Sequence, residues 1–406
     1  MPADVQQTVF AVEAPSAPPA RRPETAGVEK PARPAGEPPA RPLANAGGGT
    51  RTLLSVQYAR AVAAVGVLMF HAFNDANATA YPEQVLQAGV DLFFVISGFI
   101  MWVTTFKSDI GPKGFFGKRV RRIVPLYWLF SAIAVLTAVV APQLGKSTGA
   151  EHAIASFLFL PAVNPVTHKA EPLLAPGWTL NHEMLFYVIF ALALTLPSRK
   201  RRLMAVIGLN VLLVVVGLLT HGPLLVSFYT NPIILEFIFG VIVGWIYTSG
   251  YSASRRVSGV MVTAGALTMV LFAAAWGQTV ILRVLVWGIP AAVIVLGLAL
   301  TENAKPVARW RSGQFLGDAS YSIYIVHGVM LAALFSIVHH LGAPDAVMIP
   351  VGVPVALIGG LIVYRYIERP MTNYLGRHRR ARAPITAPPV SAPPLVRAEV
   401  AGTVDR

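Results

Sequence analysis

The stretch GVDLFFVISGFIMW, residues 89–102, decides the fold class of this chain. Asp91 and Ser97 are its only strongly polar residues, and the sequence stays largely apolar to residue 106. An apolar run of about 18 to 22 residues is long enough to cross the hydrocarbon core of a bilayer as an α-helix. We therefore interpret this stretch as a membrane-spanning helix that begins with an acidic residue.

Segments of similar length and composition follow one another along the chain. Of its 406 residues, 55% are hydrophobic and only 13% are charged, whereas a soluble domain usually carries about 25% charged residues. The sequence predicts an all-α, polytopic membrane bundle of about ten transmembrane helices over residues 50–376. The predicted spans begin near Leu53, Gly89, Ile123, Trp178, Leu203, Pro232, Val257, Val280, Ala319 and Val347.

The two ends of the chain have a different composition. Residues 1–49 and 377–406 are rich in Pro and Ala and contain no long apolar run, which predicts disordered tails. The linker at 142–177 contains AIASFLFLPAV, which is too short to cross easily and is interpreted as re-entrant or interfacial. The chain has no cysteine, which excludes disulfides and thiol nucleophiles.

The formal net charge of +14 does not indicate nucleic-acid binding, because the basic residues lie in short loops between apolar runs and in the tails. These loops alternate, so the positive-inside rule predicts cytoplasmic termini and a multi-pass protein of a bacterial inner membrane. In the loops on the opposite side of the membrane, the only Lys or Arg residues that we find are Lys146 and Lys169. The basic loops contain Lys113, Lys118, Arg119, Arg121 and Arg122; Arg199 to Arg202; Arg255 and Arg256; Lys305, Arg309 and Arg311; and Arg369, Arg377, Arg379 and Arg380.

Several ionisable side chains fall inside predicted spans, where they are costly and usually functional. Arg60 and His71 are eleven residues apart, which places them on one helix face roughly 16 Å apart. From the predicted topology we expect His71, Asp91 and Glu183 at one depth in the outer half of the membrane. Such a group suits a general base oriented by a carboxylate, and equally a buried polar pair that holds two helices together.

Other polar features leave two interpretations open. The basic stretch FFGKRVRRIVPLYW, residues 115–128, fits anionic lipid headgroups or the phosphate-binding mouth of a cofactor site. Ser97 and Gly98 allow either close helix approach or the wall of an acyl-carrying groove. His327, expected in the cytoplasmic half, fits a lone histidine that bonds a neighbour. No HExxH pattern occurs, and no metal site is predicted.

Taken together, these segments resemble the acyltransferase-3 family of membrane O-acyltransferases over about residues 51–375. SVQYARAVAAVGVLMFHA with FYTNPIILEFIFG looks closest to the exopolysaccharide-production branch of that family. The pieces that carry the resemblance are Arg60 and His71, GVDLFFVISGF at 89–99, KRVRRIVPLYW at 118–128, GWTLNHEMLFY at 177–187, SYSIYIVH at 320–327 and IERP at 367–370.

The resemblance implies transfer of an acyl group, usually acetyl, from cytoplasmic acetyl-CoA or another acyl-CoA to a sugar hydroxyl of a lipid-linked or growing polysaccharide. It implies essential roles for His71 and Arg60, a basic pair at Arg119 and Arg122, and a glutamate at Glu183. Together with the expected grouping of ionisable side chains in the outer half of the membrane, this gives His71, Glu183 and Asp91 as the predicted catalytic residues. The predicted cofactor-binding residues are Arg60, Arg119, Arg122 and Ser97.

Two questions stay open at this level. His71 could deprotonate the sugar hydroxyl directly or carry the acyl group as an acyl-histidine. A transporter or flippase for a glycan or acyl precursor also suits ten spans with buried charges, although the two similar halves common in transporters are not evident. A scaffold for polysaccharide assembly would tolerate loss of His71.

Overall fold

The computed structural model describes residues 53–77, 83–106, 108, 110–140, 149–220, 222–273 and 279–382, with side chains up to residue 376. The predicted disordered tail at 1–49 lies outside the described residues. The predicted C-terminal tail begins inside them, because the last helix continues to Arg382.

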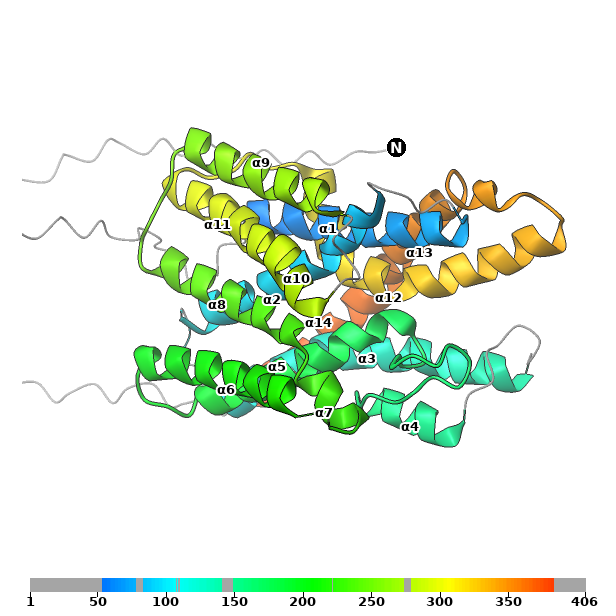
Figure 1. Ribbon diagram of the computed structural model, residues 1–406, viewed down its shortest axis with the longest axis horizontal. Coiled ribbons are helices and arrows are strands. Elements are labelled where there is room, and N and C mark those ends of the chain that lie inside the picture. Colours follow the sequence, from blue (N-terminus) through cyan, green and yellow to red (C-terminus); the bar gives the residue numbers. More distant parts are fainter. Residues whose placement is uncertain are drawn as a thin grey trace, which may run out of the picture. The chain divides into compact units, whose positions relative to one another are not determined.

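Helices make up nearly all of the described structure (Figure 1), which confirms the predicted all-α membrane fold. Outside the helices, one isolated β-bridge joins Val163 and Ala170 within the described residues. The helices are α1 Leu54–Asp75, η1 Glu83–Ala88, α2 Gly89–Phe106, α3 Pro112–Val140, α4 Ala150–Phe157, η2 Ala175–Gly177, α5 Trp178–Ala193, α6 Arg199–Leu219, α7 Leu224–Tyr229, η3 Pro232–Ile234, α8 Leu235–Thr248, α9 Arg255–Leu271, α10 Val280–Arg283, η5 Val284–Gly288, α11 Ile289–Ala304, α12 Arg311–His340, η6 Asp345–Met348, α13 Gly352–Val363, η7 Tyr364–Glu368 and α14 Arg369–Arg382.

All ten predicted spans coincide with helices, and among the described residues eight helical segments are long and apolar enough to cross a membrane. The other two predicted spans are α5 and α9, with 16 and 17 residues. At 1.5 Å per residue these two helices are about 24 to 26 Å long, slightly less than the ~30 Å hydrocarbon core. The short apolar piece in the linker forms α4, a helix of only 8 residues.

Two glycines allow α2 and α8 to pack closely. A Cβ atom at Gly98 would overlap the carbonyl oxygen of Phe237, and one at Gly240 would overlap the carbonyl oxygen of Val95. Each helix therefore places a glycine against the backbone of the other, as close helix pairs in membranes commonly do. The packing interpretation of Gly98 is confirmed, and this crossing fixes the rotation of α2 about its axis.

Helices α1 and α12 run parallel to each other. The Gln57 amide donates a hydrogen bond to Asp318, and Arg60, one turn later on α1, donates to Ser320. Further along, His71 lies beside His327. Contacts advance in the same direction on both helices, as expected for the first and ninth spans of an alternating bundle. The orientation of the bundle in the membrane stays a prediction.

Apolar side chains on the outer helices face away from the bundle. Large aliphatic residues on α6, α9 and α13 are more than half exposed, for example Leu219 at 80%, Val260 at 69% and Ile358 at 55%. A soluble protein would expose such surfaces to water at a high cost in free energy, so this pattern fits helices that contact lipid.

Candidate active site

A cavity of about 160 Å³, which we call the central cavity, lies inside the bundle between α1, α2, α3, α5 and α12. Five of the seven predicted site residues line it: Arg60, Ser97, Arg119, Arg122 and Glu183. Five other polar side chains of its wall were not predicted as site residues from the sequence. These are Thr179, Tyr187, Ser320, Tyr321 and Tyr324.

Glu183 is held by two hydroxyl groups. Ser97 of α2 donates a hydrogen bond of 2.7 Å to Glu183 Oε1, and the Tyr187 hydroxyl donates to the same oxygen. Tyr187 lies four residues after Glu183, so both side chains project from one face of α5. The two donors fix the carboxyl group at the cavity wall and leave its Oε2 outside these bonds.

Arginines of α1 and α3 supply positive charge opposite this carboxyl group. Arg60 donates to Ser320 Oγ at 2.8 Å and to Gln57 Oε1 at 3.2 Å. Arg119 donates one long bond of 3.3 Å to Thr104, and its Nε atom is buried without a partner among the described residues. Guanidinium donors that are only partly satisfied by the protein are suited to bind an anionic ligand.

A second cavity, of about 1290 Å³, adjoins the first, because Arg60, Arg119 and Arg122 line both. We call it the basic cavity. Among the described residues of its wall, the acidic side chains are Asp318 and Glu368. Its basic lining residues are Arg60, Lys118, Arg119, Arg121, Arg122, Arg309, Arg311 and Arg369. The structure thus joins basic residues from α1, α3, α12, α14 and the loop before α12 around one opening.

His71 lies outside the lining of both cavities. Its ring packs against His327, with ring centroids 5.1 Å apart and the planes tilted by 38°. His327 in turn lies 5.8 Å from the ring of Tyr324, which lines the central cavity. Ring contacts therefore lead from Tyr324 at the wall of the central cavity through His327 to His71. His327 was expected in the cytoplasmic half, but it shares the depth of His71.

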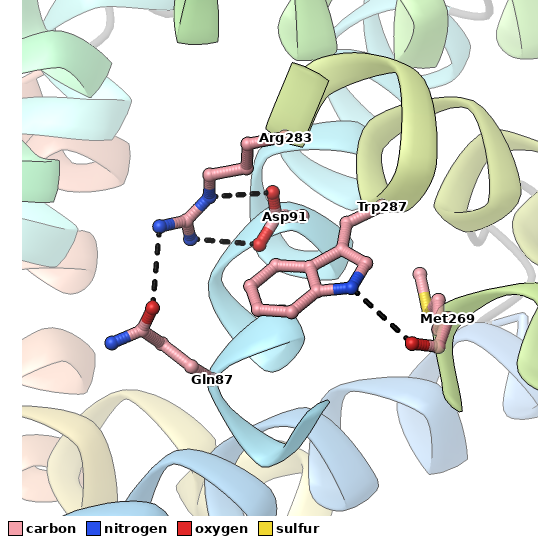
Figure 2. Close-up of polar contacts among 5 residues, drawn as sticks. All are labelled: Gln87, Asp91, Met269, Arg283 and Trp287. Carbon is pink, nitrogen blue, oxygen red and sulfur yellow. Dashed lines mark hydrogen bonds and ion pairs between the residues drawn. The ribbon is translucent and has the colours of Figure 1, made fainter. Parts of the chain in front are cut away.

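Asp91 forms a buried ion pair with Arg283 (Figure 2). Arg283 Nε and Nη2 lie 3.0 and 2.8 Å from the two carboxylate oxygens of Asp91, and Nη1 lies 3.3 Å from Gln87. The guanidinium also lies 5.3 Å from the ring centre of Trp287. Asp91 is fully buried. Arg283 was not predicted as a site residue, because in the sequence it is only a single arginine at the start of the eighth predicted span.

The expected grouping of His71, Asp91 and Glu183 is therefore wrong in its geometry, because the three side chains lie in three different environments. Asp91 and Ser97 are six residues apart on α2, which separates them by about 9 Å along the axis and turns them to different sides of the helix. Glu183 binds Ser97, whereas Asp91 faces Arg283. Neither carboxyl group is bonded to His71.

His182, which directly precedes Glu183, has a packing role. It is 2% exposed, and its ring stacks on Phe228 with centroids 4.2 Å apart. Its two ring nitrogens lie 3.1 Å from the carbonyl oxygen of Trp178 and 3.0 Å from that of Phe228. His182 thus connects α5 to α7.

The family described as an acyltransferase domain, acyltransferase-3, matches residues 53–365, which is most of the chain and includes the residues above except Glu368 and Arg369. This chain belongs to the acyltransferase-3 family. The resemblance stated from the sequence is confirmed, and the chain is a multi-pass membrane protein of this family.

Three relatives are similar to most of this chain. It is 37% identical over 328 residues to the exopolysaccharide production protein ExoZ of Rhizobium meliloti (strain 1021), covering 78% of this chain and 98% of the relative. It is 24% identical to the acyltransferase MdmB of Streptomyces mycarofaciens, over 76% and 87% of the two chains. It is 25% identical to the putative peptidoglycan O-acetyltransferase YrhL of Bacillus subtilis (strain 168), over 77% of this chain and 54% of the relative. No solved structure matches the chain.

For this acyltransferase-3 protein, the donors and acceptors in the central cavity are nitrogen and oxygen groups of Arg, Glu, Ser, Thr and Tyr, and the basic cavity adds those of Lys, Gln, Asn and Asp. Within the described residues no group of three or more His, Cys, Asp or Glu side chains is placed to hold a metal ion. The chemistry available at the site is anion binding in the basic cavity, hydrogen bonding in the central cavity and proton transfer at the two histidines.

Proposed function

We propose that this protein is an O-acyltransferase of a bacterial inner membrane that moves an acyl group, acetyl in the simplest case, from acyl-CoA to a sugar hydroxyl. The proposed acceptor is an exopolysaccharide or another cell-surface glycan, lipid-linked or growing. The observation that carries the proposal is the connection of the large basic cavity to the small central cavity through three shared arginines.

The basic cavity suits the donor's phosphates. Coenzyme A carries several phosphate groups, and arginine forks bind phosphate with two parallel hydrogen bonds. The central cavity, at about 160 Å³, is smaller than the ~300–1,000 Å³ of pockets that hold a whole small molecule. It suits the thioester end of a long donor whose nucleotide stays in the basic cavity. Arg60, Arg119 and Arg122 would bind at the junction, with Ser97 and Glu183 beyond it.

The chemistry is an acyl transfer from sulfur to oxygen. The sugar oxygen attacks the thioester carbonyl carbon, the new C–O bond forms, the C–S bond breaks, and the proton of the hydroxyl ends on the sulfur of CoA. His71 is the proposed proton acceptor for the hydroxyl, and an acyl-histidine at the same residue is the alternative route. Ser97 and Tyr187 hold Glu183 where its carboxyl group can position the reacting end of the donor. We assign Asp91 to the ion pair that fixes α2 against α10.

The acceptor assignment rests on the relatives. The relative with 37% identity is named for exopolysaccharide production, and another is named as a putative peptidoglycan O-acetyltransferase. Both names concern glycans at the cell surface. The proposed topology puts the basic cavity on the cytoplasmic side, where acyl-CoA is found, because all of its basic residues except Arg60 belong to the basic segments that the positive-inside rule places there.

The test uses the purified full chain in lipid vesicles with radiolabelled acetyl-CoA and a glycan acceptor from the producing cell. We expect alkali-labile label on the glycan with the wild type, and none with His71→Ala. His340→Ala serves as the matched control, because His340 is exposed at the end of α12. Size-exclusion chromatography shows whether each variant stays folded.

Two outcomes would count against this proposal. If the wild type binds acetyl-CoA but forms no ester, while a glycan labelled separately in its sugar crosses the vesicle membrane, the protein is a flippase. If His71→Ala forms the ester at the wild-type rate, another residue accepts the proton. Label trapped on His71 before the acceptor is added would establish the acyl-histidine route.

A further inference from the structure

His327 is a fully buried histidine with one unused nitrogen. Its Nδ1 atom lies 3.2 Å from the carbonyl oxygen of Ile323, one turn earlier on α12. A carbonyl oxygen only accepts hydrogen bonds, so Nδ1 carries the proton of the neutral ring. The Nε2 atom then holds a lone pair, and it has no hydrogen-bond partner among the described residues. A buried acceptor without a partner costs free energy, so its retention calls for an explanation.

The nearest titratable ring is His71. The two ring centroids are 5.1 Å apart, and the rings come from neighbouring parallel helices. The remaining ring neighbour of His327 is Tyr324, whose hydroxyl is engaged by Thr179 and by the carbonyl oxygen of Pro176. The carboxyl groups that the sequence suggested as partners of His71 are bound elsewhere, Asp91 by Arg283 and Glu183 by Ser97.

We propose that His327 is the positioning residue of His71, and that its Nε2 lone pair accepts a hydrogen bond from the His71 ring during acyl transfer. This inference rests on the proposed function. Such a bond fixes one nitrogen of His71 as the N–H donor, so the other nitrogen faces the acceptor hydroxyl with its lone pair. When His71 takes the hydroxyl proton, the resulting imidazolium keeps this bond, and the proton passes on to the departing CoA sulfur, which leaves both rings neutral.

A neutral acceptor suits this depth of the bundle. In a soluble triad a carboxylate holds the histidine and stabilises its positive charge. Inside a membrane bundle a carboxylate carries a high desolvation cost unless it is paired, as Asp91 is with Arg283. An imidazole acceptor gives His71 the same tautomer and orientation without a permanent buried charge. The His71 ring then also carries no net charge before the sugar substrate binds.

The experiment compares three substitutions at His327 in the vesicle assay. His327→Phe keeps an aromatic ring against His71 but removes the nitrogen, so we expect the turnover number to fall by about 10²- to 10⁴-fold, as for lost acid–base assistance. The Michaelis constant for acetyl-CoA should not change, because His327 lies outside both cavities. His327→Gln offers an amide oxygen as acceptor and should retain part of the turnover. His327→Ala should regain turnover when free imidazole is added.

Tyr324→Phe is the matched control, because it alters the same helix and breaks the bonds to Thr179 and Pro176 without touching the histidines' nitrogens. Imidazole should not raise its turnover. The inference is overturned if His327→Phe works at the wild-type rate, or if imidazole fails to restore a folded His327→Ala protein. If instead the wild type itself forms no ester, it is the proposed function that fails.

Discussion

Asp91 and Arg283, 192 residues apart in the chain, form a two-bond ion pair inside the helix bundle, with the guanidinium nitrogens 3.0 and 2.8 Å from the carboxylate oxygens. The pair joins the start of α2 to α10 and lies against Trp287 (Figure 2). Because α2 also carries Ser97 and so holds Glu183, the pair helps to set the geometry of the central cavity without entering it.

Removing one partner of this pair should destabilise the protein strongly. Arg283→Met leaves the Asp91 carboxylate buried without a partner, at a cost of about 3–5 kcal/mol in the free energy of unfolding. The double variant Asp91→Asn with Arg283→Met removes both charges and should be more stable than the single variant. The measurement is thermal unfolding in detergent, with exposed Arg255→Met as the control. A double variant no more stable than Arg283→Met would contradict the pairing.

The same double variant tests the role of Asp91. If Asp91 acts only through its ion pair, the folded double variant should retain most of its acyl-transfer rate, because neither side chain lines the central cavity. If the rate disappears while the protein stays folded and monodisperse, Asp91 takes part in the chemistry and the structural assignment is wrong.

The α2–α8 crossing should not tolerate a methyl group. Gly98→Ala and Gly240→Ala each place a Cβ against a backbone carbonyl of the partner helix, which cannot move without separating the two helices. We expect a loss of about 1–3 kcal/mol or more in stability, together with weaker donor binding. Gly208→Ala is the control, since nothing lies within 4 Å of a Cβ at that position. Equal stability of all three variants in a detergent melting assay would refute the close approach.

Arginines at the junction of the two cavities should control donor affinity. Arg119→Ala or Arg122→Ala removes charge-assisted hydrogen bonds to phosphate, worth about 1.5–3 kcal/mol each. The dissociation constant for CoA should therefore rise roughly 10- to 100-fold. Titration calorimetry of the purified protein measures this constant. The control is Arg255→Ala with Arg256→Ala, which removes two exposed basic residues from the start of α9, outside both cavities. A similar effect of the control would show that net charge alone attracts the donor.

The predicted topology can be tested with single cysteines, because the chain has none of its own. Lys169→Cys lies in an exposed loop predicted outside, and Arg256→Cys lies in the exposed first turn of α9, which is predicted in the cytoplasm. In intact cells an impermeant maleimide should label only the first, and both should react after the membrane is opened. Labelling of Arg256→Cys in intact cells would reverse the proposed orientation and move the basic cavity to the outer face.

The sequence by itself determined the membrane class, the positions of the helices and five of the residues that line the central cavity. Apolar runs identify spans because a bilayer demands about 20 apolar residues per helix, and this requirement is local in the chain. The family motifs then identified Arg60, Ser97, Arg119, Arg122 and Glu183, which the structure brings to one cavity.

Only the tertiary structure decided which side chains are partners. Asp91 was expected beside His71, yet it pairs with Arg283, and His71 instead lies beside His327. Depth can be counted along a helix, but the rotation of a helix and its neighbours depend on packing between distant segments, such as the glycine contact of α2 with α8. That rotation turns Asp91 away from Glu183 and leaves His71 with an imidazole as its neighbour.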